Sequence, residues 1–403
     1  MAARDDAALQ DVHENGVLRM DRLPMADDRG DGYAILRAAG PVVRSDAGYL
    51  VTTRELAEHV FKNPETFSSE RAFDTLGSPV PLVPIAFDPP DHTRYRRLLQ
   101  PFFTPRAAAA LEDTVRAQVV EIVDEFATGR SADLVADLAR PVPAKVFLSL
   151  FGLPLSDLDR LMDWREVIIR MADLSGAGEA PPEAMASAAE LFEYVSAHVA
   201  ASRAGRAGGL LRSLFDDSDF TDEEAVGLCF LFVLAGVDSV TNALSLMFAK
   251  LASRPELRGL VASDPAAIPA AVEEMLRVDP ANAVVPRVAT EDVVLAGVPI
   301  PAGSPVGVAV GAANRDPADL DDPDAFDPSR DYNNLTWGSG PHRCLGIHLA
   351  RTELRVVLEE FHRRVPEYEI APGQSPRVDW PTGVIGVTSV PIVVTPRAAA
   401  AAT

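Results

Sequence analysis

The chain has 403 residues, of which 47% are hydrophobic, and a formal net charge of −22 at pH 7. This composition is ample for a sizeable core, and so acidic a surface argues against a nucleic-acid partner, because phosphates need a basic footprint. The only two cysteines, Cys229 and Cys344, exclude a disulfide framework and a four-thiolate metal site and suit a reducing cytoplasm.

The N-terminal half begins with an acidic segment that lacks the apolar core of a secretory signal. We expect disorder in residues 1–20 and in the tail 397–403, with one domain over 21–396. Residues 41–53 are rich in β-branched and aromatic side chains, which predicts a small sheet. Helical patterns then dominate, at 54–62, 90–102, 107–127, 141–150, 156–171 and 182–204.

The run Ser175–Pro182 between two of these helices is rich in glycine and proline. It is either a mobile lid over a binding site or a plain exposed linker.

The segment 221–252 predicts a long central helix of about 45 Å. Thr221 and Glu224 form a capping-box signature at its start. Apolar residues surround every face from Val226 to Leu234, which indicates a buried core helix. The uncharged run 225–237 is shorter than the roughly 20 residues of a membrane span, so we expect a soluble protein with no membrane-spanning segment.

The C-terminal part combines helices at 266–278 and 346–365 with short strands at 284–288, 292–295 and 305–310 and further strands near the end. Between them the polar stretch 314–334 has no periodicity, a feature of functional or disordered loops. The chain as a whole is predicted to be mainly α with a minor β-sheet region.

One cysteine lies in a glycine-rich turn that directly precedes an apolar helix. The loop 337–346 contains three glycines, which let the backbone take turns that other residues disfavour. The free amides and the dipole of the helix that begins near Gly346 would stabilise a thiolate at Cys344. Taken alone, a buried structural cysteine in a glycine-rich turn is the better explanation.

The flanking sequence W-G-S-G-P-H-R-C-L-G, followed by I-H-L-A-R, resembles the haem-binding loop of the cytochrome P450 family. Trp337 stands where the family more often has phenylalanine. The resemblance implies haem b ligated by Cys344 and bordered by Trp337, Gly338 and Gly346, in a triangular, prism-like single domain with a long central oxygen-binding helix. Thiolate donation favours cleavage of the O–O bond, which implies a monooxygenase that uses molecular oxygen.

Two further segments match the same family. Glu274 and Arg277 lie one helical turn apart, a spacing that alone describes a solvated surface pair. By resemblance they are the Glu-x-x-Arg motif, with Arg330 as the third member of a structural charge cluster.

The segment D-P-P-D-H-T-R-Y-R-R resembles the start of the family's C helix. His92 and Arg96 share one face of this helix, and arginine suits the carboxylates of haem propionates. By resemblance Arg287 and His342 complete the propionate-binding set.

The predicted central helix is interrupted by Ala235-Gly236-Val237-Asp238-Ser239. A charge among apolar residues is costly unless it is paired or used, so the alternatives are a kinked core helix with a paired Asp238 and an oxygen-activating site. The segment resembles the family's oxygen-binding groove, with serine in place of the usual threonine. We therefore hypothesise that Asp238 relays protons and that Ser239 positions water at the oxygen-binding site.

The substrate pocket implied by the resemblance is mostly aliphatic, which favours a hydrophobic small molecule held by few polar contacts. Steroids, terpenoids, polyketides and aromatic acids all remain open. Besides the loop before Asp88, its predicted wall residues are Leu234, Val237, Val284, Val285, Val384 and Ile385.

Partners and alternatives also follow from the resemblance. We expect a cytoplasmic monomer that takes electrons from a ferredoxin or flavodoxin and an NAD(P)H-dependent reductase, docked near Arg97, Arg343 and Arg351. A peroxide-driven member of the family is the nearest rival, although that class carries an arginine where this chain has Asp238 and Ser239. A non-enzymatic haem sensor or electron carrier is the rival from another class.

Overall fold

The computed structural model describes residues 9–73, 78, 80–125, 131–174 and 182–394. Most of this part is helical. Its helices are α2 (Arg29–Ala39), α3 (Arg54–Lys62), α4 (Asp91–Leu99), α5 (Pro105–Asp124), α6 (Pro141–Phe151), α7 (Leu158–Leu174), α8 (Pro182–Arg203), α9 (Leu210–Asp217), α10 (Asp222–Leu231), α11 (Ser239–Ser253), α12 (Pro255–Ser263), α13 (Ile268–Val278), α14 (Val310–Ala313) and α15 (Ile347–Arg364).

Three small sheets complete the described fold. A seven-stranded sheet has the order β1 (His13–Glu14), β2 (Val17–Leu18), β3 (Val42–Ser45), β4 (Gly48–Val51), β10 (Pro305–Ala309), β7 (Val284–Ala289) and β5 (Phe67–Ser68). A three-stranded sheet joins β11 (Tyr368–Ile370), β12 (Pro391–Val394) and β6 (Ser131–Asp133), and β8 (Val293–Leu295) pairs with β9 (Val298–Ile300).

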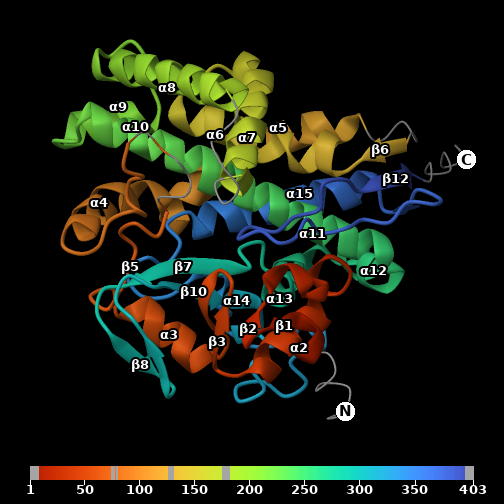
Figure 1. Cartoon of the computed structure of the whole chain (residues 1–403). Coiled ribbons are helices and arrows are strands. Elements are labelled where there is room, and N and C mark those ends of the chain that lie inside the picture. The colour runs from red at the N-terminus through yellow and green to blue at the C-terminus, as the bar shows by residue number, and fades with distance from the viewer. Residues whose placement is uncertain (1–8, 74–77, 79, 126–130, 175–181, 395–403) are drawn as a thin grey trace, which may run out of the picture.

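The elements separate into a helical region and a sheet region (Figure 1). Helices α4 to α9 lie in the first, the larger sheet with α2, α3 and α13 lies in the second, and α10, α11 and α15 run between them. Strand β10 pairs parallel with β4 and antiparallel with β7, so segments more than 200 residues apart share one sheet. The predicted mainly α fold with minor sheets is confirmed.

The predicted helices and strands agree with the structure to within a few residues at their ends. Four helices of the described part were not predicted: α2, α9, α12 and α14. Helix α2 contains two glycines, which weaken the helical pattern, and it starts at the Asp28 side chain, which accepts the backbone N–H of Asp31. Helix α12 begins at Pro255, a favourable first-turn residue that we did not use as a start signal.

The predicted disorder of residues 1–20 is wrong for residues 9–20. Strands β1 and β2 form a hairpin, and β2 joins β3 in the larger sheet. Val12 and Leu18 are buried in the core beside that sheet, so burial of apolar side chains orders a segment whose sequence lacks clear periodicity. Residues 1–8, 175–181 and the tail from residue 395 lie outside the described part of the chain.

The central helix is not a continuous α-helix. The predicted capping box between Thr221 and Glu224 opens α10, and a π-helical turn, η8 (Phe232–Asp238), separates α10 from α11. The whole segment Asp222–Ser253 is apolar and long enough to cross a membrane, but 71% of its most apolar window is buried inside the molecule. It is the core helix of the fold.

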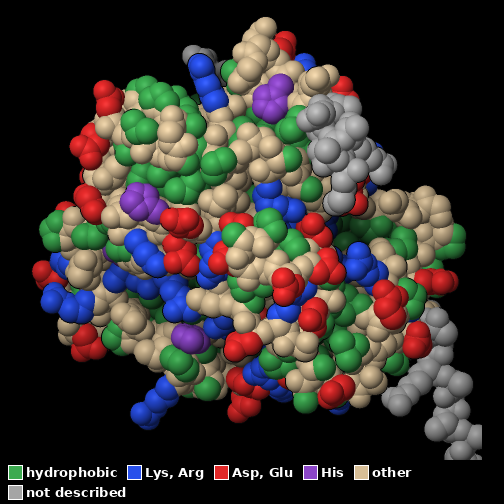
Figure 2. All heavy atoms as spheres, turned by 90° about the horizontal axis from the view of Figure 1, so that it is seen from below, with side chains coloured by type: hydrophobic (Ala, Val, Ile, Leu, Met, Phe, Trp, Pro, Cys, Tyr) green, Lys and Arg blue, Asp and Glu red, His purple; other side chains and the backbone are tan. Residues whose placement is uncertain are grey.

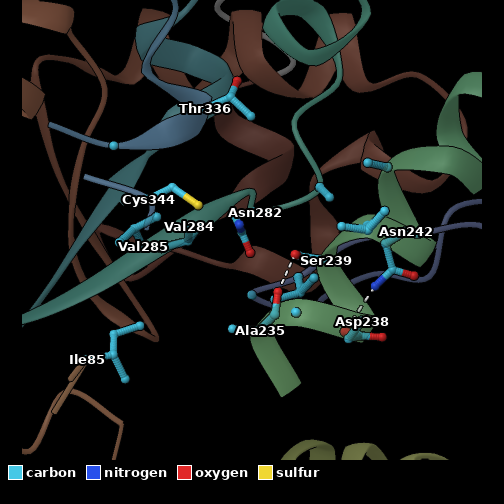
Figure 3. A pocket seen from close by; sticks show the side chains of 18 of the residues that line it. Ile85, Ala235, Asp238, Ser239, Asn242, Asn282, Val284, Val285, Thr336 and Cys344 are labelled. Carbon is cyan, nitrogen blue, oxygen red and sulfur yellow. Dashed lines mark hydrogen bonds between the residues drawn. The ribbon is translucent and has the colours of Figure 1, made fainter. Parts of the chain in front are cut away.

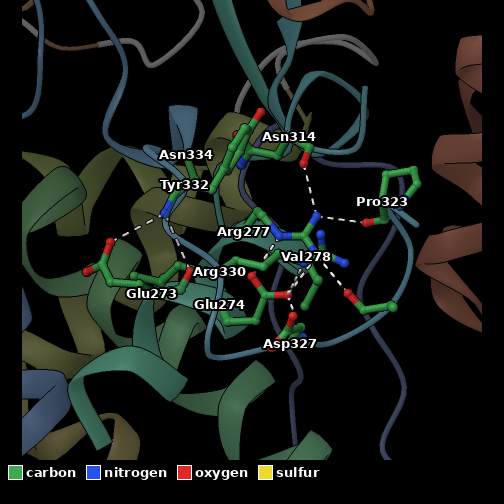
Figure 4. A network of polar contacts seen from close by, with 12 residues as sticks. Glu273, Glu274, Arg277, Val278, Asn314, Pro323, Asp327, Arg330, Tyr332 and Asn334 are labelled. Atoms are coloured by element: carbon green, nitrogen blue, oxygen red, sulfur yellow. Dashed lines mark hydrogen bonds and ion pairs between the residues drawn. The ribbon is translucent and has the colours of Figure 1, made fainter. Parts of the chain in front are cut away.

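The Glu274–Arg277 pair is buried, not solvated (Figure 4). Arg277 donates to both carboxylate oxygens of Glu274, at 2.7 and 2.8 Å, and to three backbone carbonyls of the polar stretch 314–334. Glu274 in turn accepts the backbone N–H of Asp327, and Arg330 lies 3.7 Å from it. This charge network holds a stretch without helices or long strands in place and leads the chain into the cysteine loop.

Candidate active site

The cysteine loop is shaped by two glycines and one close backbone approach. Gly338 and Gly340 have φ angles of 67° and 66°, which favour glycine. A Cβ at Gly340 would lie 2.3 Å from the backbone oxygen of Phe61, so a larger residue would push the loop away from α3. The loop closes where the Cys344 amide donates to the Trp337 carbonyl at 2.8 Å, directly before α15.

Burial raises the pKa of the Cys344 thiol, and the opposing effects of the Gly346 amide and of Arg96 are smaller. The protein alone therefore leaves the thiol neutral. A bound metal ion deprotonates a coordinating thiol outright, so this environment suits a thiolate that is formed by metal binding.

Cys344 faces a cavity of about 1170 Å³ (Figure 3). In that view its sulfur lies on one side, and Ala235, Asp238 and Ser239 of the central helix lie on the other. Most residues predicted for the site line this single cavity. They are His92, Arg96, Ala235, Gly236, Asp238, Ser239, Val284, Val285, Arg287, Trp337, Gly338, His342, Cys344, Gly346 and Val384.

The cavity has a cationic end. The ring centroids of His92 and His342 are 4.0 Å apart, and one ring nitrogen of each is buried without a hydrogen-bond partner in the described structure. Burial lowers the pKa of His92 to about 3 and that of Arg287 to about 10. Within the described part of the chain, no carboxylate lies in ion-pair distance of Arg287 or Arg96. Buried cations without counterions fit two propionate carboxylates of haem.

The opposite wall is the π-helical turn η8 and the first turn of α11. The Ser239 hydroxyl donates to the Ala235 carbonyl at 2.5 Å, a bond across the turn. Asp238 is 8% exposed, and its carboxylate accepts a bond from the Asn242 amide at 3.1 Å. Asp238 and Ser239 thus both line this wall of the cavity, with Asp238 oriented by Asn242.

Two of the residues predicted for the substrate wall do not line the cavity. Val237 and Ile385 are both fully buried and do not line the cavity, because their side chains point into the helical core. The side chain of Leu234, in η8, lies outside the described structure. Val284, Val285 and Val384 do line the cavity, as does Ile85 from the loop before Asp88.

Four lining or supporting residues were not anticipated from the sequence. Asn282 and Glu353 line the cavity, Asn242 bonds Asp238, and Asp88 lies 3.8 Å from His342. Asn282 could have been predicted from the sequence, because it is a polar residue inside the apolar segment of Ala281, Ala283 and Val284.

Comparison with known proteins agrees with this geometry. The family model described as cytochrome P450 matches residues 267–392. Mycinamicin IV hydroxylase/epoxidase of Micromonospora griseorubida is 36% identical over 320 residues, covering 77% of this chain and 79% of that protein. Vitamin D(3) 25-hydroxylase of Pseudonocardia autotrophica is 33% identical over 390 residues, which cover 91% of this chain and 94% of that protein.

Among solved structures, a mutant of P450 EryK in complex with erythromycin B superposes with a TM-score of 0.82 at 32% identity, covering 93% of this chain and 99% of that one. These relatives are more than 30% identical to this chain and cover from 77% to 93% of it. The chain belongs to the cytochrome P450 family.

Proposed function

We propose that this P450 inserts one oxygen atom from O₂ into an apolar small molecule by hydroxylation or epoxidation, in secondary metabolism or catabolism. The observation that carries this is one cavity with Cys344 on one side and the Asp238–Ser239 turn on the other. The relatives named above are hydroxylases or epoxidases, which supports a monooxygenase over a haem sensor or an electron carrier.

The cofactor is haem b, which supplies the oxidising chemistry when it is bound through the Cys344 thiolate. Arg96 and Arg287 would pair with its propionates, and the neutral rings of His92 and His342 beside them can donate hydrogen bonds to the same carboxylates. Trp337, Gly338 and Gly346 border the same space and would shape the pocket beside the thiolate.

Asp238 and Ser239 would handle protons on the substrate side. The carboxylate of Asp238, oriented by Asn242, can take up a proton and pass it toward the cavity. The Ser239 hydroxyl already donates to Ala235, so its oxygen is positioned to accept a hydrogen bond from a water in the cavity.

The substrate would be bulky. The cavity of about 1170 Å³ has to hold haem and substrate together, and its substrate side is walled by Ile85, Val284, Val285 and Val384. By their names, two relatives act on mycinamicin IV and vitamin D(3), and a solved neighbour holds erythromycin B. A macrocyclic or polycyclic apolar compound fits these observations.

Electrons would come from a ferredoxin or flavodoxin with its NAD(P)H-dependent reductase, and the enzyme would act as a soluble cytoplasmic monomer. Lys and Arg side chains gather on the left of the face in Figure 2, although the net charge is −22. Arg97 and Arg343 are exposed, whereas Arg351 is paired with Glu273 at 2.7 and 2.9 Å. Arg97 and Arg343 are therefore the better docking candidates.

The central test is spectral and chemical. The reduced carbon monoxide complex should absorb at the long wavelength characteristic of a thiolate ligand, and a ferredoxin system with O₂ should give a product carrying one O₂-derived oxygen. An imidazole-like spectrum would exclude the thiolate. Product that forms only with added peroxide would instead identify a peroxygenase.

Docking is tested by charge removal. Arg343→Gln should slow reduction by ferredoxin, most strongly at low salt. Arg377→Gln is the matched control, since Arg377 is equally exposed but pairs with Asp27 elsewhere. Equal rates for the two variants would remove Arg343 from the docking face.

A further inference from the structure

Asn282 is a polar residue in an otherwise aliphatic part of the cavity wall. It lies two residues before β7, and Figure 3 shows its amide projecting from that side toward the Ala235–Ser239 turn. Its neighbours on the wall are Val284 and Val285. An amide at this position is costly in an apolar pocket unless something bonds to it.

The backbone around Asn282 is fixed. Asn282 forms an antiparallel bridge with Val384, the Ala283 amide donates to Gly383 at 3.0 Å, and the Ile385 amide donates to Ala281 at 2.7 Å. Ala283 is buried and does not line the cavity, whereas Asn282 before it and Val284 and Val285 after it do.

The side chain of Asn282 has no hydrogen bond within the described part of the chain. The other oxygen- or nitrogen-bearing side chains labelled in Figure 3 all have one: Ser239 bonds Ala235, Asn242 bonds Asp238, and Thr336 donates to the Leu276 carbonyl at 2.8 Å. The Asn282 amide is thus available to a ligand.

We infer that Asn282 determines specificity by binding a neutral hydrogen-bonding oxygen, a carbonyl or a hydroxyl, on an otherwise apolar ring substrate. This inference rests on the proposed function and narrows its substrate class. The neutral amide gives no charge complement to a carboxylate, but it can donate through Nδ2 and accept through Oδ1. A wholly apolar compound would strip water from the amide and replace it with nothing, so it would bind less well.

The test uses matched probes and matched variants. Cyclododecanone, cyclododecanol and methylenecyclododecane have nearly the same shape and differ in hydrogen bonding, and the cyclooctane and cyclopentadecane analogues cover other sizes. Their dissociation constants are read from the spectral shift of the haem protein. The ketone or the alcohol should bind about tenfold more tightly than the methylene compound, because a tenfold difference in affinity corresponds to the net free energy of about one hydrogen bond. Preference for the ketone alone would assign Nδ2 as the bonding atom, and preference for the alcohol would assign a hydroxyl substrate.

In Asn282→Leu this preference should disappear. The exchange keeps the branched shape and the number of heavy atoms and breaks no hydrogen bond within the described structure, so the fold is expected to persist. Val384→Ala, a change in the aliphatic wall, should weaken all probes of one ring size by the same factor, and Asn282→Gln should retain part of the preference.

The inference would be overturned if neither the ketone nor the alcohol bound more tightly than the methylene compound, if the preference were unchanged in Asn282→Leu, or if no ring bound. A thiolate-type carbon monoxide spectrum in the same protein would show that the proposed function had survived. Loss of that spectrum in the unaltered protein would mean that the proposed function itself had failed.

Discussion

Two buried arginines illustrate how the surroundings of a residue separate structural from ligand-binding roles. Arg277 is 1% exposed and satisfies its guanidinium with Glu274 and three backbone carbonyls. Arg287 is 3% exposed, and within the described residues its guanidinium donates to the carbonyl of its neighbour Pro286 and lies over the Phe61 ring, with no carboxylate in ion-pair distance. The guanidinium of Arg277 has its hydrogen bonds and its counterion within the protein. That of Arg287 is suited to pair with a bound anion.

Replacing these arginines should have opposite consequences. Arg277→Leu leaves Glu274 buried and unpaired and should cost about 3–5 kcal/mol of stability. Arg287→Leu removes an uncompensated buried charge, so the haem-free protein should be no less stable, while haem is lost about tenfold faster to an acceptor protein. Denaturant unfolding and haem-transfer rates measure the two effects. Equal destabilisation of the haem-free protein by both changes would contradict the assignment.

Ser239 controls coupling between electrons and product if its hydroxyl orders water in the cavity. Ser239→Ala removes that hydroxyl and should increase peroxide released per electron several-fold, with a matching fall in product. Ser239→Thr adds a methyl group that restricts the rotamer and should lower peroxide release below that of the natural protein. Peroxide and product are quantified against NAD(P)H consumed. The role is wrong if Ser239→Ala leaves both yields unchanged.

At the scale of elements, the C-terminal loop and α11 meet at one glycine. A Cβ at Gly386 would lie 2.2 Å from Oδ1 of Asn242, the residue that orients Asp238. A Cβ at Gly383 would meet only the Val284 backbone oxygen, at an ordinary 3.9 Å. Packing between two distant segments therefore sets the position of the proposed proton-relay carboxylate.

Gly386→Ala should push Asn242 away and weaken its bond to Asp238. We expect a loss of about 1–3 kcal/mol of stability from overpacking, with increased peroxide release and a changed solvent deuterium isotope effect on product formation. Gly383→Ala should change none of these appreciably. If both variants shift the isotope effect alike, Asn242 does not act through Asp238.

At the scale of the whole molecule, Asp279 ties helices together that are far apart in the sequence. Its carboxylate is buried between Arg29 of α2, at 2.8 Å, and Lys250 of α11, at 2.6 Å. Burial alone would raise the pKa of Asp279, but the two cations hold it well below its usual range. The unfolded chain therefore binds the proton more tightly than the folded one.

Acid should therefore lower the stability that this ion pair contributes. This pairing stabilises the fold fully above the unfolded pKa of about 3.9 and loses its contribution as the pH falls further. Asp279→Asn should cost about 3–5 kcal/mol at neutral pH and should show a shallower loss of stability below pH ~4. Asp324→Asn, at a half-exposed carboxylate that pairs with Arg315 and Arg37, should cost less than Asp279→Asn. Unfolding free energies over a pH series measure both.

The sequence by itself was enough for the family, the ligand cysteine, the charge cluster and most helices. These depend on short spacings, such as glycines near Cys344 or an acid and a base one helical turn apart. Such spacings are visible in the sequence because the residues involved are close together in the chain. Only the tertiary structure decided that Asn282 faces the cavity while Val237 and Ile385 do not, and that Arg287 has no carboxylate in ion-pair distance among the described residues. Those outcomes depend on which distant segment packs against each residue: the register between β7 and the C-terminal loop turns one side chain inward and its neighbour away.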